Sequence, residues 1–290
     1  MMADLCRRAL DAGIEADYVR RLVGKRRLMP APPPIDCEQW PWALKIFTLG
    51  GFAMVRGNET VQFSGKIQKR PLELLKFLIA GGGAASQEQI ADCLWPDAAG
   101  DAAYSALKVT LSRLRRLLGV EGAIRWQEGK VSLDPRIGYV DAQAFLQVVA
   151  QFEKAIKEDV DRLCAENSPV LRLADKAVAI YRGSFLLDDE EKFWVIPQRE
   201  RLRSRFSSLV TRIGELLGKT GQWEKALAFY RRGVEVDELA EEFHQGLMIC
   251  HRELGRRANA VEAYHHCRKL LAAKLGIEPS PKTAAIYKSL

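Results

Sequence analysis

Residues 101–119 limit the fold of this chain more than any other stretch, because a helix there would carry two incompatible faces. Its leucines recur at intervals of four, three and four residues, at Leu107, Leu111, Leu114 and Leu118. That spacing places them on one stripe, which requires a hydrophobic core to cover it. After Asp101 the opposite side carries cations and small residues but no acid. We therefore expect a helix that is capped by Asp101, ends at Gly119 and leaves a basic face exposed.

The exposed face of this predicted helix has the composition that reading of the DNA major groove requires. Arginine donates a fork of hydrogen bonds to guanine, serine allows close approach, and valine contacts a thymine methyl group. The candidate base-reading residues are Ser105, Lys108, Val109, Ser112, Arg113 and Arg116. A solvated charged face is the alternative interpretation. The neighbouring elements of the chain have to decide between the two.

The charge distribution favours an anionic partner for the middle of the chain. Residues 44–140 contain 13 basic and 9 acidic residues, and so carry +4 of the net charge of +7. The 290 residues, of which 48% are hydrophobic and 28% charged, suffice for two compact domains. We therefore expect a folded protein whose basic character is concentrated in its middle segment.

The cysteines and the apolar runs predict where the protein works. The six cysteines are scattered and form no CxxC pair, which fits reduced thiols better than a disulfide framework. No apolar run reaches membrane length, and the first thirty residues are charged throughout and contain no secretory signal. We expect a cytoplasmic, nucleoid-associated protein without a membrane partner.

The amino-terminal region predicts a boundary between separate parts. Residues 1–29 contain two short helical patterns, 3–13 and 14–28. Residues 30–43 follow with five prolines, which suppress helix and sheet and favour a stiff, extended linker. We therefore place a domain boundary in this linker.

Residues 44–140 alternate between strand and helix patterns. The expected elements are paired strands in 44–63, helices over 68–80, 86–95 and 101–118, a hairpin over 123–134 and a last strand over 137–140. Strands, two helices, a basic helix and a hairpin follow one another in the order of a winged helix-turn-helix. In that fold the third helix enters the major groove and the hairpin lies along the DNA backbone. This context favours the DNA-reading interpretation of residues 101–118.

Residues 141–290 are helical throughout and contain an internal repeat. Three residue types recur at a spacing of 34, namely Gly221, Ala226 and Tyr230 with Gly255, Ala260 and Tyr264. A weaker third copy lies in 175–182. Thirty-four residues is the period of a tetratricopeptide unit, in which a small alanine lets two helices approach. We expect a stacked all-α array in which the tyrosine fills the gap to the next hairpin.

The motifs of both regions resemble a known family of regulators. The first region contains, in order, LKIFTLGGF, SGKIQKRPLELLKFLI, LWPD, SALKVTLSRLRRLLG and YVDAQAF. These motifs resemble the OmpR-type winged-helix domain, in the version found in the antibiotic regulatory protein (SARP) family of bacterial activators. The second region resembles the bacterial transcriptional activator domain, above all in LGIEPSPKTAAIYKSL. The segment before residue 44 looks like the connector of larger regulators with an ATPase module, so the chain is either a stand-alone regulator or the carboxyl-terminal part of one.

The resemblance implies an α+β winged helix-turn-helix domain over 44–140, followed by an all-α, tetratricopeptide-like activator domain over 141–290. It implies a sequence-specific activator that binds double-stranded promoter DNA, contacts RNA polymerase and often acts as a homo-oligomer. By position, it places DNA phosphate contacts at Lys66, Lys69, Arg70, Arg115, Arg125, Gln127 and Lys130.

Enzymatic and metal-binding interpretations have weaker support. The stretch GELLGKT, residues 214–220, has one residue too few between its glycines for a phosphate-binding loop and lies at a helix end. A metal site would have to draw on residues without short-spaced ligand pairs, namely His244, Cys250, His251, His265, His266 and Cys267. We therefore expect no enzymatic activity, no cofactor and no metal.

A helical adaptor, whose winged helix serves protein contacts, is the serious alternative function. The basic face of residues 101–118 argues against it, because an adaptor would not need uncompensated cations there. If the division of labour is as expected, removal of residues 141–290 should abolish activation and leave DNA binding by residues 44–140 intact.

Overall fold

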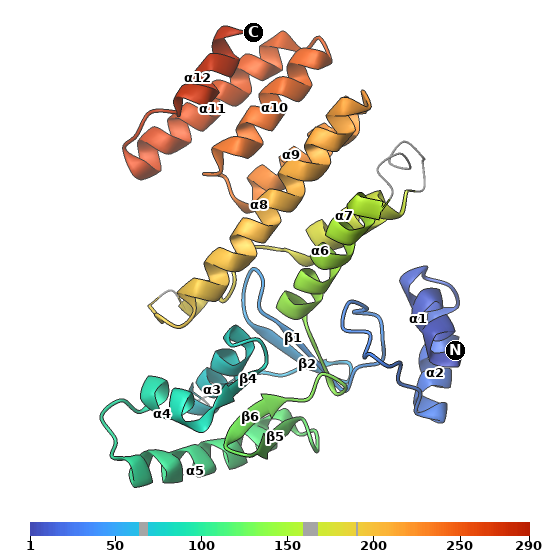
Figure 1. Cartoon of the computed structure of the whole chain (residues 1–290), viewed down its shortest axis with the longest axis vertical. Coiled ribbons are helices and arrows are strands. Elements are labelled where there is room, and N and C mark those ends of the chain that lie inside the picture. The colour runs from blue at the N-terminus through green and yellow to red at the C-terminus, as the bar shows by residue number, and fades with distance from the viewer. Residues whose placement is uncertain (64–68, 159–167, 190) are drawn as a thin grey trace. The chain divides into compact units, whose positions relative to one another are not determined.

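The computed structural model of the chain describes residues 1–63, 69–158, 168–189 and 191–290. The chain divides into two compact units (Figure 1). The first comprises residues 1–147 and 185–200, and the second comprises residues 148–184 and 201–290. No helix in these described ranges has both the length and the apolar composition that crossing a bilayer requires.

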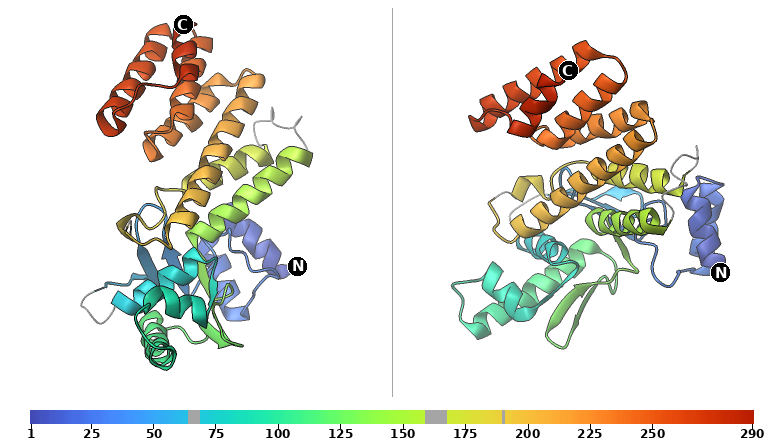
Figure 2. Two further views of the ribbon diagram at one scale, coloured as in Figure 1. Left: turned by 60° about the vertical axis from the view of Figure 1, so that its left-hand side comes forward. Right: turned by 45° about the horizontal axis from the view of Figure 1, so that its top comes forward.

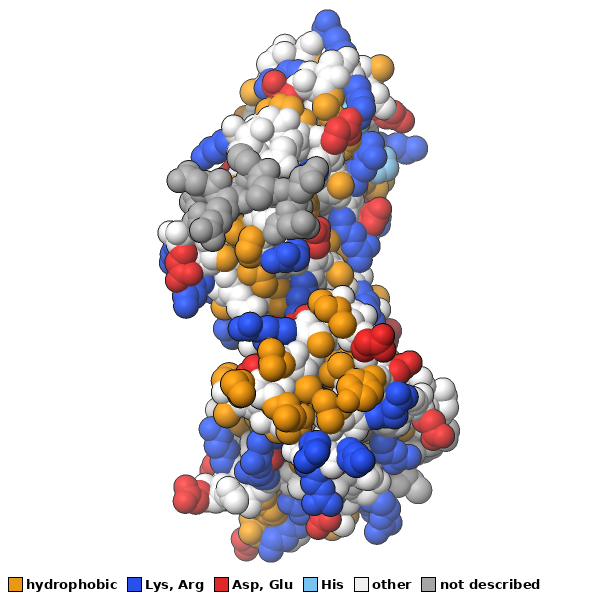
Figure 3. Space-filling view, turned by 90° about the vertical axis from the view of Figure 1, so that its right-hand side faces the viewer, with side chains coloured by type: hydrophobic (Ala, Val, Ile, Leu, Met, Phe, Trp, Pro, Cys, Tyr) orange, Lys and Arg blue, Asp and Glu red, His pale blue; other side chains and the backbone are white. Residues whose placement is uncertain are grey.

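The first unit begins with a helical hairpin, as expected for residues 3–28. Its helices are α1, Met2–Asp11, and α2, Ala16–Arg26. The hairpin buries one set of side chains, Cys6, Leu10, Val19 and Val23, and exposes another apolar set, Met2, Leu5, Ile14 and Tyr18. Figure 3 shows hydrophobic side chains gathered on the face that this hairpin presents.

The proline-rich segment 30–43 differs from the extended linker that its composition predicts. Trp40 and Trp42 are buried, and the Trp42 indole nitrogen donates to the carbonyl oxygen of Cys37 at 2.8 Å. The buried Asp36 carboxylate accepts from the Arg7 guanidinium at 3.0 Å. Burial of two indole rings outweighs the stiffness of the prolines, so this segment is folded into the first unit and no domain boundary lies there.

A four-stranded sheet follows, in the order β3-β2-β1-β7. Its strands are β1, Leu44–Phe47, β2, Ala53–Arg56, β3, Glu59–Thr60, and β7, Gly138–Val140. Strand β1 pairs antiparallel with β2 and parallel with β7, so the expected last strand closes the sheet that the first strands begin.

Three helices and a second sheet form the rest of the winged helix-turn-helix. The helices are α3, Lys69–Ala80, α4, Gln87–Leu94, and α5, Gly100–Leu118. The second sheet has the order β4-β6-β5, with β4, Ala84–Ser86, β5, Ile124–Gln127, and β6, Lys130–Leu133. The expected hairpin is therefore widened by a strand, β4, which is too short to show a sequence pattern.

Helix α5 packs as its leucines predict. All four leucines of the stripe are at most 1% exposed. Gly119 ends the helix with φ of 63°, in the left-handed conformation expected there. The expectation for Asp101 is wrong, because the helix begins one residue earlier and Ala99 occupies the cap position without a side-chain hydrogen bond. Asp101 instead lies in the first turn of α5, where its negative charge interacts favourably with the helix dipole.

The boundary at residue 141 also differs from the expectation. Helix α6, Asp141–Glu158, begins in the first unit, where the buried Asp141 carboxylate accepts from the backbone nitrogens of Thr48 and Leu49. The part of the expected helix beyond Glu158, residues 159–167, lies outside the described residues. A fragment of residues 44–140 would therefore lack a carboxylate that the first unit buries.

The segment 185–200 returns to the first unit, which no local sequence pattern predicts. The backbone nitrogen of Leu186 donates to the carbonyl oxygen of Thr48 at 2.8 Å. Two ion pairs join the segment to α3: Asp189 with Lys76 at 2.6 Å, and Lys192 with Glu73 at 2.7 Å. Removal of residues 141–290 would take this segment away as well.

The second unit is the expected helical array. Its helices are residues 148–158 of α6, then α7, Pro169–Ile180, α8, Ile196–Lys219, of which residues 201–219 belong to this unit, α9, Trp223–Val236, α10, Glu241–Glu253, α11, Arg257–Leu275, and α12, Pro281–Lys288. The repeated alanines, Ala226 and Ala260, are fully buried, and the repeated glycines, Gly221 and Gly255, have φ of 72° and 71° in the turns between helices.

The repeated tyrosines pack against the next element of the array, as the repeat predicts. The ring of Tyr264 stacks on that of Tyr287 in α12, with centroids 4.0 Å apart. The ring of Tyr230 lies between two glycines, Gly214 of α8 and Gly246 of α10, so closely that a side chain at either glycine would overlap it. These glycines are therefore required by packing.

Replacement of Gly246 by alanine should lower the free energy of unfolding of the array by about 1 to 3 kcal/mol, because the added methyl group displaces the Tyr230 ring. Thermal unfolding followed by circular dichroism measures the loss. Gly24→Ala in α2 is the matched control: its added methyl meets open space, so it should be neutral or stabilise by up to about 1 kcal/mol. Equal melting temperatures of the two variants would contradict the wedge role of Tyr230.

Candidate nucleic-acid interface

Helix α5 presents all six candidate base-reading residues to solvent. These six exposed candidates are Ser105, Lys108, Val109, Ser112, Arg113 and Arg116. They lie opposite the buried leucines, and both views of Figure 2 show α5 at an edge of its unit. The helix therefore carries one continuous polar and basic face with Val109, which is 49% exposed, as its small apolar member.

Two guanidinium groups on this face have no ion-pair partner among the described residues. Among the described residues, neither Arg113 nor Arg116 takes part in an ion pair, and both side chains are exposed. The Lys108 ammonium lies 4.3 Å from the centroid of the Tyr104 ring. Exposed arginines that have no internal carboxylate retain their full set of donors for an external acceptor.

Arg115, a candidate phosphate contact, also forms hydrogen bonds within the protein. Its Nε and Nη2 atoms both donate to the carbonyl oxygen of Ile124, at 3.4 and 3.3 Å. This contact fastens α5 to strand β5, the first strand of the wing. Arg115 as a whole remains exposed despite this contact.

The wing carries its three candidates on β5 and β6. Gln127 and Lys130 are exposed and face each other in register at the tip of the hairpin. Arg125 pairs with the buried Asp134 carboxylate at 2.5 Å, so part of its guanidinium is held by the fold. Arg136, which is not among the candidates from the sequence, forms a second ion pair with the same carboxylate at 2.8 Å and is 54% exposed. The hairpin tip, Gln127 with Lys130, is therefore more available to bind an external phosphate than Arg125 is.

The candidates at the start of α3 have different environments. Lys69 and Arg70 are both exposed in the first turn of the helix. The Arg70 guanidinium forms an ion pair with Glu73 at 2.7 Å, whereas no ion pair of Lys69 occurs in the described part of the chain. Lys66 lies outside the described residues. The amino end of a helix favours anions, which suits a phosphate contact at Lys69.

One aromatic pair beside these residues is not among the candidates that the sequence predicts. Tyr104 of α5 is 41% exposed, and its ring packs edge to face on Trp126 of β5 with centroids 5.4 Å apart. The available signal was an aromatic side chain on an otherwise polar and basic helix face.

The metal-ligand candidates and the GELLGKT stretch do not form a binding site within the described residues. Within the described residues no three His, Cys, Asp or Glu side chains are grouped as metal ligands. Burial raises the pKa of Cys250 to about 12 and that of Cys267 to about 11, so neither thiol is disposed to ionise. The glycines of GELLGKT, Gly214 and Gly218, lie inside α8 against Tyr230 and Trp223 and form no phosphate-binding loop.

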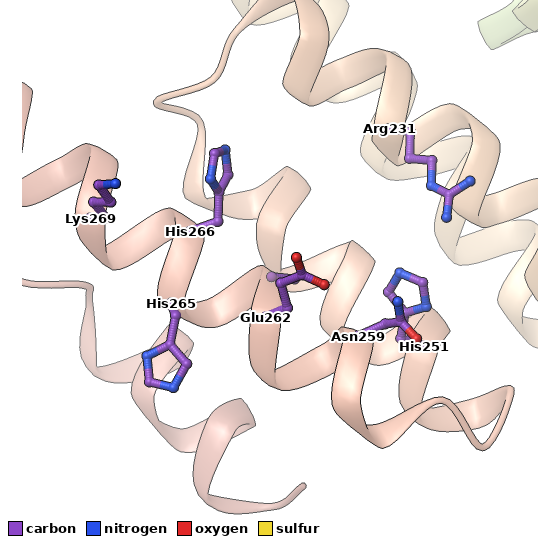
Figure 4. Close-up of a pocket in the computed structure, with 8 residues that line it drawn as sticks. Arg231, His251, Asn259, Glu262, His265, His266 and Lys269 are labelled. Carbon is purple, nitrogen blue, oxygen red and sulfur yellow. The ribbon is translucent and has the colours of Figure 1, made fainter.

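The histidines of the array form no group of three metal ligands in the described part of the chain, although the ring centroids of His244 and His266 are 5.9 Å apart. Figure 4 shows His265 and His266 projecting from opposite sides of α11. Burial lowers the pKa of His244, whose Nε2 lies 2.8 Å from the carbonyl oxygen of Glu238. A hollow of about 480 Å³ is lined by Arg231, His251, Asn259, Glu262, Ala263, His265, His266 and Lys269. Three histidines and Glu262 line this hollow, but among the described residues they do not come together as a group of three metal ligands.

Comparison with known proteins identifies the family. The model of the bacterial transcriptional activator domain matches residues 140–290, which include the whole of α6 and the helical array. The chain belongs to this family. The array of the activator domain follows the winged helix directly, as the SARP-type resemblance predicts.

Two relatives of this bacterial transcriptional activator domain protein extend the match to the winged helix. Regulatory protein AfsR of Streptomyces griseus is 26% identical over 249 residues, which cover 86% of this chain and 24% of AfsR. Transcriptional regulator RedD of Streptomyces coelicolor is 26% identical over 212 residues, which cover 69% of this chain and 57% of RedD. The chain therefore spans less than two thirds of either relative.

A solved structure confirms the fold. Mycobacterium tuberculosis EmbR, in complex with a low-affinity phosphopeptide, has a TM-score of 0.60 and 19% sequence identity, and the match covers 85% of this chain and 64% of that chain. The α+β winged helix-turn-helix followed by a tetratricopeptide-like array is thus confirmed, and with it the SARP-type architecture.

Proposed function

We propose that this chain is a sequence-specific DNA-binding transcriptional activator that reads the major groove with α5. The observation that carries the proposal is the division of α5: its leucines are buried, while six side chains suited to base edges are exposed on the other side. The names of the relatives, a regulatory protein and a transcriptional regulator, support a role in transcription.

The proposed mode of binding follows from the geometry. Arg113 and Arg116 donate to guanine bases, and the small side chains of Ser105 and Ser112 allow the helix backbone to approach. The wing tip, Gln127 with Lys130, and the first turn of α3 contact the phosphate backbone, which orients α5 in the groove.

The decisive experiment is selection of binding sites from a random duplex library by the full chain. Fluorescence anisotropy on the selected site and on a scrambled duplex, over a range of salt concentrations, then gives the specificity ratio. Clear preference for the selected site supports the proposal. Equal affinity for both duplexes would contradict it and favour the helical adaptor, in which the winged helix contacts protein.

Lys69→Ala should weaken binding to all duplexes by a similar factor and lower the slope of log affinity against log salt by about one, because it removes one phosphate contact. Anisotropy titrations at several salt concentrations measure both quantities. Lys282→Ala, at an exposed lysine of the array, is the matched control and should change neither. A loss of affinity at Lys69→Ala that is confined to the selected site would contradict a phosphate role.

We further propose that the array provides the contact with RNA polymerase or with a second copy of the chain. Stacked helical repeats present extended surfaces for protein partners, which supports this assignment. Sedimentation of the full chain with and without the selected duplex, and transcription in vitro with a bacterial polymerase, test the two contacts separately. A monomer on DNA that does not stimulate the polymerase would overturn both.

A further inference from the structure

Three aromatic and cationic side chains link the exposed face of α5 to the wing. The Lys108 ammonium lies over the Tyr104 ring at 4.3 Å from its centroid. The Tyr104 ring also contacts the Trp126 ring of β5, and the two ring planes form an angle of 63°. Tyr104 therefore touches both a candidate base-reading residue and the wing.

The direction of the Lys108 side chain explains the first contact. Long side chains in a helix point back toward the amino terminus, and Tyr104 lies four residues before Lys108 on the same face. The face of an aromatic ring attracts an ammonium group, which restricts a side chain with several rotatable bonds. The contact therefore favours conformations of Lys108 in which the side chain lies back along α5 over the Tyr104 ring.

The second contact ties the two DNA-facing elements together. Tyr104 with Trp126 and Arg115 with the Ile124 carbonyl oxygen are two separate contacts between α5 and β5. A recognition helix and a wing that are fastened to each other lose less conformational freedom when both meet one duplex.

We propose that Tyr104 is a positioning residue for DNA recognition, whose ring directs Lys108 toward a base pair and holds β5 against α5. This inference rests on the proposed function and deepens it. Tyr104 acts through Lys108 and Trp126, and its hydroxyl group has no part in the role.

Four variants of the full chain test the proposal: Y104F, Y104L, K108A and the double variant Y104L/K108A. Each is titrated against the selected duplex and against a panel in which every base pair is changed singly. Y104F keeps the ring and should bind within about twofold of the wild type. Y104L should bind the selected duplex about two- to fivefold more weakly, since it loses the cation–π contact.

The pattern of discrimination separates positioning from simple loosening. Y104L and K108A should lose preference at the same base pair, and the double variant should be weakened by less than the product of the single effects. A merely structural role of Tyr104 would weaken binding to all duplexes alike. Melting temperatures monitor folding, and Y104Q replaces Y104L if the leucine variant unfolds.

Three results would overturn the positioning role alone: full wild-type discrimination by Y104L, a uniform loss on every duplex, or independent effects of Y104L and K108A. A wild-type chain that prefers no duplex would overturn the proposed function and the positioning role together. The two failures are therefore distinguishable in the same set of titrations.

Discussion

Arg116→Ala is expected to cost about 1 to 3 kcal/mol of binding free energy on the selected duplex and to relax the preference at one base pair. Arg113→Ala should behave in the same way at a different base pair. Both guanidiniums are exposed on α5 and, among the described residues, form no ion pair, so their donors are available to a guanine edge. Anisotropy titrations against singly changed duplexes measure the loss and assign the base pair.

The matched control for both arginines is Arg257→Ala, at an exposed arginine of the array. It should leave affinity and discrimination unchanged. Wild-type affinity of both α5 variants for the selected duplex would contradict base reading by this helix and would leave the adaptor as the better explanation.

Asp141→Ala is expected to lower the free energy of unfolding of the first unit by about 3 kcal/mol or more. The Asp141 carboxylate is 2% exposed and accepts from the backbone nitrogens of Thr48, Leu49 and Ala142 at 2.8 to 2.9 Å, and from the Thr48 hydroxyl at 2.6 Å. Its removal leaves several buried donors without an acceptor, and each costs about 1 to 3 kcal/mol. Chemical denaturation of the full chain measures the loss.

Thr48→Val provides the graded comparison, because it removes only the hydroxyl donor and keeps the backbone contacts. Its expected loss is about 1 kcal/mol. An Asp141→Ala variant that is as stable as the wild type would show that water replaces the carboxylate, and the link between the end of β1 and the start of α6 would lose its importance.

The elements with a local periodicity could be predicted from the sequence. The leucine spacing of residues 107–118 predicted both the buried stripe and the exposed face of α5, because every helix places residues three and four apart on one side. The spacing of 34 residues predicted the array, since each hairpin repeats the same packing with its neighbour. Ser86 and Gln89 form a capping box at the start of α4, within the helix expected over 86–95.

The environment of the candidate site could be predicted only in part. Exposure of Arg113 and Arg116 follows from the helix pattern, whereas the commitment of Arg125 to Asp134 and of Arg115 to Ile124 depends on how the wing folds back on α5. Tyr104 was missed for the same reason, because its partner Trp126 lies 22 residues away along the chain.

The winged helix, the basic exposed face of α5 and the repeating array could be predicted from the sequence alone, because they depend on periodicities of three to four residues and of 34 residues. Three features follow only from how the chain packs: strand β4 joins the wing, residues 30–43 are folded into the first unit, and residues 185–200 belong to that unit. Those features depend on pairings between distant segments, where buried indole rings, a buried carboxylate and ion pairs outweigh what the local composition favours.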